Sequence, residues 1–305
     1  MAITPTKKIW FNGELIPWDE AKIHVLTHTL HYGMGVFEGI RAYETDDGPG
    51  VFRLTDHMKR LANSAQIMMM PMPYSVEELI QAVKDTVAST GLDSCYIRPI
   101  AYYGYGEMGL NTLPCETDVA IACWPWGAYL GDDAVTKGVR MKISSWQRHD
   151  HNIMPPASKT TGNYVNSSLA KVEALKAGYD EAILLNRAGM VAECTGENIF
   201  VSRGGKLITP PLSSGALEGI TQDTVMTIAH DLGFEAVIGE LSRSDLYIAD
   251  EMFVCGTAAE VSAVNSVDDR ELPCPGPMTT AIAAEYARAV RGKVDRYKDW
   301  VEHAR

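Results

Sequence analysis

The sequence has little positive charge for its length. Its 305 residues include 27 lysines and arginines against 39 aspartates and glutamates, which gives a formal net charge of −12 at pH 7. Nucleic acids and anionic membrane surfaces are bound through a basic footprint. We therefore exclude both as main partners. An anionic substrate stays open, because a site can build its own local positive field.

Targeting signals and long apolar runs are missing as well. The first eight residues (MAITPTKK) contain neither an apolar core nor an arginine-rich amphipathic stretch. We therefore expect no export or transit signal and a cytoplasmic location. The longest apolar runs, such as residues 119–126, are far shorter than the roughly 20 residues of a membrane span, and Pro125 interrupts that run.

The six cysteines show no CxxC pair and no regular spacing. A disulfide framework is not expected in a chain of this length, so we interpret the cysteines as reduced packing residues, and we predict no metal site. The hydrophobic content of 46% and the charged content of 22% are ordinary for a soluble globular protein. The length is sufficient for two sizeable cores.

Local signals fix one turn and one helix start. Asn12 and Gly13 supply the two positive-φ positions of a type I′ turn, which predicts a hairpin near the N-terminus. Ser75 and Glu78 form a capping box that opens a helix ending near Gly91. Further helices are expected from about residue 55 and at residues 163–177, 221–232 and 278–291. Strands are expected at residues 95–103, 117–124 and 142–146, followed by a meander of strands at 181–185, 190–193 and 198–201.

These elements predict an α+β fold in two domains, because strands and helices are mixed without a regular βαβ rhythm. Glycines and acidic residues follow an apolar strand at residues 127–133, which is typical of a linker. We place a smaller N-terminal domain at residues 1–126, a linker at 127–135 and a larger C-terminal domain at 136–305.

Three side chains suggest cofactor chemistry. Lys159 lies in the run PASKTTGNY (residues 156–164), among small and hydroxylic residues rather than the charges of an exposed face. Tyr164 ends that run, and Glu193 has the apolar neighbours Val191, Ala192 and Cys194, which favours a buried, partnered carboxylate. An amine, a phenol and a separate carboxylate are the parts of a pyridoxal phosphate site. Alternatively, Lys159 is an ordinary surface lysine, Tyr164 an aromatic residue of the core, and Glu193 an exposed acid on an edge strand.

Other segments could bind anions. A glycine turn at residues 218–224 (EGITQDT) opens a helix, so the amides of Ile220 and Thr221 can point at an anion, although every capped helix shares this feature. Tyr96 and Arg98 share one face of an extended strand, because side chains alternate along it. Arg60 could be an ordinary surface arginine of an amphipathic helix.

Together with the run HYGMGVFEGIR at residues 31–41, these motifs give the chain a resemblance to a known family. The chain resembles the branched-chain amino-acid aminotransferases of the fold-type IV pyridoxal phosphate family, from about residue 8 to beyond residue 277. The resemblance implies a two-domain, D-amino-acid aminotransferase-like fold with the cofactor between the domains. It also implies transfer of the amino group of L-leucine, L-isoleucine or L-valine to 2-oxoglutarate, reversibly and by a ping-pong mechanism, in amino-acid biosynthesis.

The family motifs assign roles to residues of this chain. Lys159 is the catalytic lysine that forms the Schiff base, Tyr164 hydrogen-bonds the ring oxygen of the cofactor, and Glu193 keeps the pyridine nitrogen protonated. The implied cofactor-binding residues are Arg60, Lys159, Tyr164, Glu193, Gly196, Leu217, Ile220, Thr221 and Thr257. The implied substrate-binding residues are Tyr32, Phe37, Tyr96, Arg98, Trp126, Tyr129, Thr257 and Ala258.

Several alternatives stay open. A D-amino-acid aminotransferase or an aminodeoxychorismate lyase of the same fold would also have the lysine and the glutamate, although the strand with Tyr96 and Arg98 favours the branched-chain class. A cofactor-carrying binding protein without turnover is the option from another class. Glu107 and its tyrosine neighbours depart from the expected apolar wall. The resemblance further implies a homodimer at least, or a homohexamer, in which Tyr32 reaches the neighbouring subunit's site.

Overall fold

The computed structural model describes residues 3–127, 130 and 137–304. They form two compact units: the first comprises Met1–Trp126, Ser158–Gly162 and Arg288–Arg305, and the second comprises Gly127–Ala157 and Asn163–Ala287. The chain thus leaves the first unit at the expected place, but two later segments that we assigned to a continuous domain at 136–305 belong to the first unit. The expected linker, residues 127–135, lies mostly outside the described residues.

The first unit contains an antiparallel sheet with the strand order β17-β5-β4-β6-β7-β1-β2, to which β3 adds on β6. The last strand of the chain, β17, pairs with β5, which draws the C-terminus into this unit. The strands are β1 (Lys8–Phe11), β2 (Glu14–Pro17), β3 (Gly35–Phe37), β4 (Ile40–Thr45), β5 (Gly48–Phe52), β6 (Cys95–Tyr103), β7 (Thr117–Trp124) and β17 (Val301–His303). The helices are η1 (Trp18–Glu20), α1 (His28–Tyr32), α2 (Leu54–Ile67), α3 (Val76–Thr90) and η4 (Asp295–Trp300).

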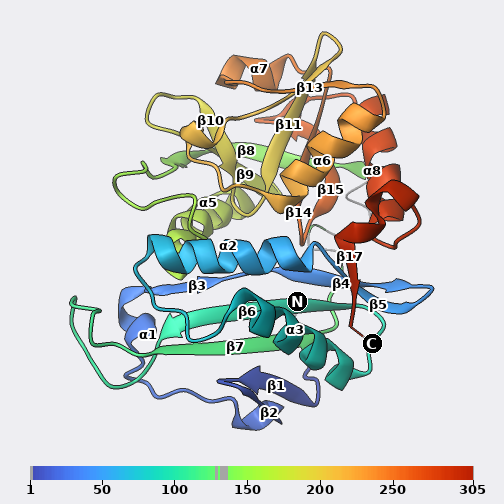
Figure 1. The fold of residues 1–305 in the computed structure, drawn as a ribbon. Helices are drawn as coiled ribbons and strands as arrows, with labels where there is room; N and C mark the ends of the chain where they lie inside the picture. The colour runs from blue at the N-terminus through green and yellow to red at the C-terminus, as the bar shows by residue number, and fades with distance from the viewer. Residues whose placement is uncertain (1–2, 128–129, 131–136, 305) are drawn as a thin grey trace. The chain divides into compact units, whose positions relative to one another are not determined.

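Local signals in the sequence explain several of these elements. The β1–β2 hairpin turns at Asn12 and Gly13, whose φ angles of 45° and 101° confirm the expected positive-φ turn. Ser75 and Glu78 form the expected capping box of α3. Helices α2 and α3 pack against each other, and α3 covers β1, β6 and β7 (Figure 1). Their fully buried large apolar side chains are Leu54, Met58, Leu61, Leu79, Val83 and Val87.

The second unit contains a mixed sheet with the order β10-β9-β8-β15-β14-β11-β12-β13, and β16 pairs with β15. The strands are β8 (Val139–Gln147), β9 (Glu181–Leu185), β10 (Val191–Cys194), β11 (Asn198–Arg203), β12 (Lys206–Thr209), β13 (Glu235–Ile238), β14 (Glu251–Gly256), β15 (Glu260–Val267) and β16 (Arg270–Glu271). The helices are η2 (Thr161–Asn163), α5 (Tyr164–Lys176), η3 (Leu212–Ser214), α6 (Ile220–Asp231), α7 (Arg243–Tyr247) and α8 (Pro277–Ala289).

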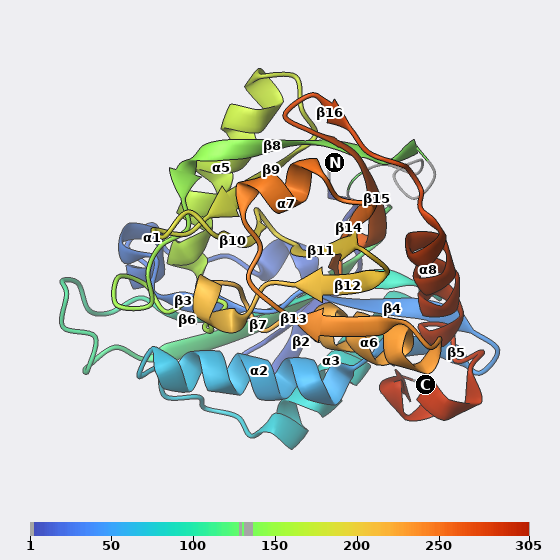
Figure 2. The ribbon, with the colours of Figure 1, turned by 90° about the horizontal axis from the view of Figure 1, so that it is seen from above.

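The order of these strands corrects the expected meander. β10 and β11 are not paired, because β9, β8, β15 and β14 lie between them in the sheet. Three pairs of strands are parallel, β8 with β9, β8 with β15 and β12 with β13. In two of them the strands directly flank a helix in the sequence: β8 and β9 enclose α5, while β12 and β13 enclose α6 (Figure 2). The fold is α+β with mixed helices and sheets, and these two βαβ crossovers are an addition to what the sequence predicted. Among the described residues, no helix combines the length and the apolar character that a membrane crossing requires.

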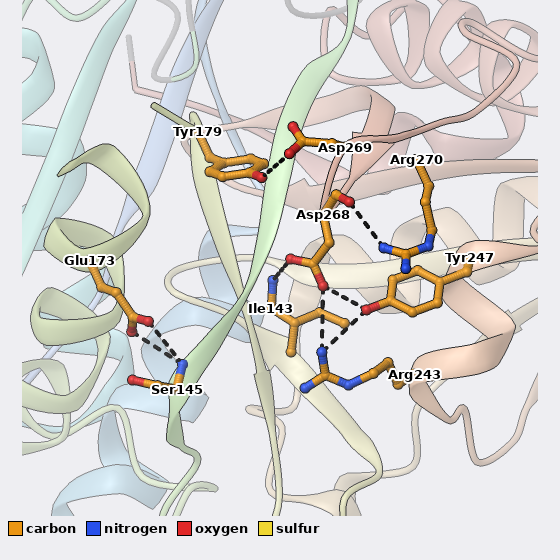
Figure 3. A network of polar contacts seen from close by, with 9 residues as sticks. All are labelled: Ile143, Ser145, Glu173, Tyr179, Arg243, Tyr247, Asp268, Asp269 and Arg270. Atoms are coloured by element: carbon orange, nitrogen blue, oxygen red, sulfur yellow. Dashed lines mark hydrogen bonds and ion pairs between the residues drawn. The ribbon is translucent and has the colours of Figure 1, made fainter. Parts of the chain in front are cut away.

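A polar network ties three parts of the second unit together (Figure 3). Asp268 accepts hydrogen bonds from the Ile143 amide of β8 at 3.1 Å and from the Tyr247 hydroxyl of α7 at 2.6 Å. The guanidinium of Arg270 lies 3.9 Å from the centroid of the Tyr247 ring. Asp268 and Asp269 have φ angles of 46° and 61°, as the two central residues of a type I′ turn require. The network fixes the β15–β16 hairpin against β8 and α7.

The capping box of α3 gives a local prediction. Ser75→Ala removes the acceptor of the Glu78 amide, and loss of a serine N-cap costs about 1 kcal/mol. Hydrogen exchange at the Glu78 amide should therefore become about fivefold faster. Ser89→Ala, at the other end of the same helix, is the matched control. Unchanged exchange at Glu78 in the Ser75 variant would show that the box does not hold the first turn.

Candidate functional site

The segment around Lys159 is fixed to the first unit by its backbone. The Lys159 amide donates to the Ser64 hydroxyl of α2 at 3.0 Å, and its carbonyl accepts from the Phe37 amide at 3.0 Å. Farther along, the Thr161 hydroxyl donates to the Gly33 carbonyl at 2.6 Å. The Nζ of Lys159 lies 5.2 Å from the centroid of the Phe37 ring. Lys159 is thus half-buried, and hydrogen bonds fix its backbone. This differs from the solvated surface lysine of the alternative interpretation.

Arg60, on α2, is held by a buried carboxylate. Its Nε and Nη2 lie 2.7 and 2.8 Å from the two carboxylate oxygens of Glu38, a bidentate pair. Glu38 also accepts a hydrogen bond from Nδ1 of His57 at 2.7 Å. Glu38 is fully buried and His57 is 2% exposed. The sequence analysis quoted the run that contains Glu38 but gave neither it nor His57 a role.

The charges of this cluster follow from its burial. Burial alone would raise the pKa of Glu38, but Arg60 and His57 outweigh it and hold that pKa well below the usual range of a carboxyl group. Burial lowers the pKa of His57 against the opposing effect of Glu38, and the positive charges of Arg60 and Lys159 lower it further. At neutral pH the cluster therefore consists of a neutral imidazole, a carboxylate and a guanidinium.

The first unit also brings together four of the residues expected at a substrate pocket. Nη2 of Arg98 donates to the Tyr96 hydroxyl at 2.9 Å, and its guanidinium lies 4.7 Å from the centroid of the Phe37 ring. The Tyr96 and Trp126 rings are 4.6 Å apart. Gly39 leaves room for this cluster, since a Cβ there would lie 2.2 Å from the Tyr96 hydroxyl oxygen. The result is a cation surrounded by aromatic rings.

Tyr32, another expected substrate residue, is not part of this cluster. Tyr32 lies on α1 with 39% of its surface exposed, and its ring packs against His28 at 4.6 Å. Tyr129 lies outside the described residues. The assignment of both residues to a substrate pocket stays a prediction.

In the second unit, Glu193 is buried and partnered, as its apolar neighbours suggested. One carboxylate oxygen lies 2.7 Å from Nη2 of Arg148, and the other accepts from the Leu217 amide at 2.9 Å. Arg148 also donates from Nε to the Gly215 carbonyl at 3.1 Å. The sequence analysis missed Arg148, because it stands in a polar run (QRHDH) with no distinctive spacing.

The expected phosphate residues gather around the start of α6. The helix begins at Ile220 with Gly219 as its N-cap, and its first amides have no acceptor within the helix. A Cβ on Gly219 would lie 1.9 Å from the side-chain oxygen of Asn198, whose side-chain nitrogen donates to the Leu217 carbonyl at 3.1 Å. Asn198 is paired in register with Cys255, next to the turn that carries Thr257 and Ala258.

Two further expected residues have clear positions. Gly196 lies beside the β14 strand end, since a Cβ on Gly256 would be 3.2 Å from the Gly196 carbonyl. Tyr164 is the first residue of α5 and is half-buried. A cavity of about 490 Å³ lies beside Arg148 and Gly215 in this unit, and its lining also includes His149 and Arg187. Within the described ranges, no three histidine, cysteine, aspartate or glutamate side chains cluster as a metal site.

The buried imidazole of His57 predicts a pH dependence. Its pKa is lower in the folded protein than the ordinary 6.5, so the unfolded chain binds a proton first as the pH falls. The stability that neutral His57 contributes is complete above about pH 6.5 and is lost as the pH falls below it. His57→Asn keeps an N–H donor for Glu38 but cannot be protonated.

The apparent Tm of the wild-type protein should therefore fall more between pH 7.5 and pH 5.5 than that of His57→Asn. His303→Asn, which changes an exposed histidine of β17 in the same unit, is the control and should follow the wild type. Equal Tm differences in wild type and His57→Asn would contradict the assignment.

Comparisons with known proteins agree with this arrangement. Residues 35–267 match the model of the family "Amino-transferase class IV". A branched-chain-amino-acid aminotransferase of Pseudomonas aeruginosa is 45% identical over 294 residues, which cover 96% of this chain and 95% of the relative.

Two solved structures of branched-chain amino acid aminotransferases are also similar. The structure of the Escherichia coli protein has a TM-score of 0.96 and 43% identity, with 98% of this chain and 100% of that chain covered. The structure of the Thermobaculum terrenum protein in its PLP form has a TM-score of 0.92 and 38% identity, with 99% of each chain covered. This chain belongs to the class IV aminotransferases and, within them, to the family of the branched-chain-amino-acid aminotransferases.

Proposed function

We propose that the protein transfers the amino group of L-leucine, L-isoleucine or L-valine to 2-oxoglutarate, reversibly, in a ping-pong reaction that uses pyridoxal 5′-phosphate. Family membership supports the reaction class. The observation that carries the substrate assignment is Arg98, a guanidinium hydrogen-bonded to Tyr96 and lying over the Phe37 ring. Such a group can pair with a second carboxylate, while its aromatic neighbours can contact an aliphatic side chain.

The donor groups fit the cofactor. The cofactor's phosphate needs N–H and hydroxyl donors, which the first amides of α6 and the Thr257 hydroxyl can supply. Arg60, which the bidentate contact with Glu38 holds in place, would add a guanidinium, the group best suited to bind a phosphate. A protonated ring nitrogen needs an acceptor, and the carboxylate of Glu193 has lone pairs beyond its two present contacts. Gly196 has open space where a Cβ would lie.

Bound pyridoxal phosphate supplies an electron sink for the charge that develops at Cα of the amino acid. Lys159 would hold the cofactor covalently through its Nζ, and the same atom would accept the proton from Cα of the amino acid. Glu193 would hold the proton on the ring nitrogen. Tyr164 would hydrogen-bond the ring oxygen, and Leu217, Ile220 and Thr221 would contribute backbone amides.

The substrate's two ends would meet different residues. The α-carboxylate would accept from the Tyr96 hydroxyl and from the amides of Thr257 and Ala258. Arg98 would pair with the distal carboxylate of glutamate and stay out of the apolar space when leucine is bound. The walls of that space would include Phe37 and the other aromatic residues assigned above, namely Tyr32, Trp126, Tyr129 and Tyr164.

We further propose that the protein works as a homodimer at least. The exposed aromatic ring of Tyr32, within the family run at residues 31–41, supports this proposal, because it would reach the site of the neighbouring subunit. Light scattering of the purified protein measures the assembly directly.

Lys159 is the first residue to test. Borohydride reduction of the wild-type protein with bound cofactor, followed by peptide mapping, should place the label on Lys159 alone. Lys159→Ala should fold, lose the label and lose turnover by several orders of magnitude, because the covalent catalyst and the proton carrier disappear together. A label on another lysine would overturn the whole site assignment.

Arg98 separates the two half-reactions. Arg98→Met keeps much of the side chain's shape but cannot pair with a carboxylate. We expect it to weaken the glutamate half-reaction by about 2–5 kcal/mol, the range for truncating one member of a buried charge pair. The leucine half-reaction should change much less. Single-turnover measurements with each amino acid test this, and equal losses would mean that Arg98 binds the α-carboxylate or supports the fold.

A further inference from the structure

We infer that Arg148 is a positioning residue for the proposed reaction: it fixes the carboxylate of Glu193 in the orientation that meets the ring nitrogen of the cofactor. This inference rests on the proposed function, because only there does Glu193 face that nitrogen. Arg148 would not touch the cofactor or the substrate. It would act through Glu193.

The contacts of Arg148 leave its guanidinium little freedom. Nη2 lies 2.7 Å from one oxygen of Glu193, while Nε donates to the Gly215 carbonyl at 3.1 Å. The guanidinium is planar, so two contacts from different nitrogens fix both its place and its rotation. The side chains of Arg148 and Glu193 are only 6% and 9% exposed, so water does not compete strongly for either group.

The second oxygen of Glu193 is held from another segment. It accepts from the Leu217 amide at 2.9 Å, so the carboxylate cannot rotate without losing either this bond or the contact with Arg148. Each oxygen of an ionised carboxylate can accept about two hydrogen bonds. The two present contacts therefore fix the plane of the carboxylate and leave acceptor capacity for a ring N–H.

The backbone at Gly215 gives the Arg148 side chain a surface to pack against. Gly215 has a φ of 100°, a conformation that side chains with a Cβ rarely adopt. A Cβ there would also lie 3.2 Å from Cγ of Arg148. Glycine at this position therefore satisfies both the backbone and the arginine that packs on it.

The surrounding charges show why Glu193 needs its own cation. Burial together with Glu181 raises the pKa of the nearby Glu197 to about 8, against the opposing effect of Lys171. The histidine next to Arg148 cannot replace it, because burial, Arg148 and His151 lower the pKa of His149 to about 4. Arg148 is thus the permanent positive charge beside Glu193.

A double-mutant cycle tests the inference through cofactor affinity. Fluorescence titration with pyridoxal phosphate gives the dissociation constant of the cofactor-free protein for wild type, Arg148→Met, Glu193→Gln and the double variant. Arg148→Met alone should weaken binding at least about thirtyfold, as expected for truncating one member of a buried charge pair. In the Glu193→Gln background the same substitution should change binding less than about threefold, because the carboxylate on which Arg148 acts is gone.

Two further variants keep the test decisive. Arg148→Lys retains the charge and can make only one of the two contacts, so its loss should be intermediate and should also vanish in the Glu193→Gln background. Arg148→Lys replaces Arg148→Met in the cycle if Arg148→Met does not fold. Arg140→Met, on strand β8 that directly precedes Arg148 and in an exposed ion pair with Asp269, is the matched control and should bind pyridoxal phosphate as the wild type does. Equal losses from the Arg148 substitutions in both backgrounds would overturn the inference.

A competition experiment distinguishes a specific effect of Arg148 on the ring end of the cofactor site from a general disruption of the site. Inorganic phosphate competes for the phosphate end of the cofactor site, so its inhibition constant should stay within about threefold of wild type in Arg148→Met. A large loss of phosphate competition would mean that the substitution disturbs the whole site. Failure of the proposed function has a different signature: wild type would not bind pyridoxal phosphate at all, or borohydride would label a lysine other than Lys159.

Discussion

Two buried carboxylates, each paired with an arginine, organise the residues that we assign to the cofactor. Glu38 binds Arg60 in the first unit, and Glu193 binds Arg148 in the second. A buried charge without a partner costs several kcal/mol, so each pair can exist only as a pair. The two pairs differ in which member we assign to the cofactor. In the first the arginine is the group offered to a ligand, and in the second it is the carboxylate.

Backbone contacts carry the rest of the proposed chemistry. The segment with Lys159 is fixed by hydrogen bonds from its main chain to Ser64 and Phe37. The start of α6 presents amides because Gly219 gives Asn198 room to bind the preceding loop.

The sequence predicted well what depends on neighbouring residues. The hairpin at Asn12 and Gly13, the capping box at Ser75 and strands β6, β7 and β9 agree with the structure, because turn chemistry and side-chain alternation determine them locally. Glu193 was expected to be buried and partnered from its apolar neighbours, and it is. Four of the residues assigned by family resemblance lie together in the first unit, namely Phe37, Tyr96, Arg98 and Trp126.

The sequence could not predict which strands pair when they are far apart in the chain. Nothing near residues 190–201 indicates that four strands separate β10 from β11, and nothing near β17 indicates that it pairs with β5. For the same reason, the sequence did not indicate the orienting roles of Glu38, His57 and Arg148. An arginine or glutamate that binds a residue far away in the sequence looks locally like any other charged residue.

Profiling of amino donors and acceptors tests the central claim most directly. Purified protein with pyridoxal phosphate would be given L-leucine, L-isoleucine, L-valine and their D-enantiomers, each with 2-oxoglutarate, and the glutamate formed would be measured. We predict glutamate from the three L-amino acids and almost none from the D-enantiomers. Preference for D-amino acids, or no amino transfer from any of the six, would contradict a branched-chain L-amino-acid aminotransferase.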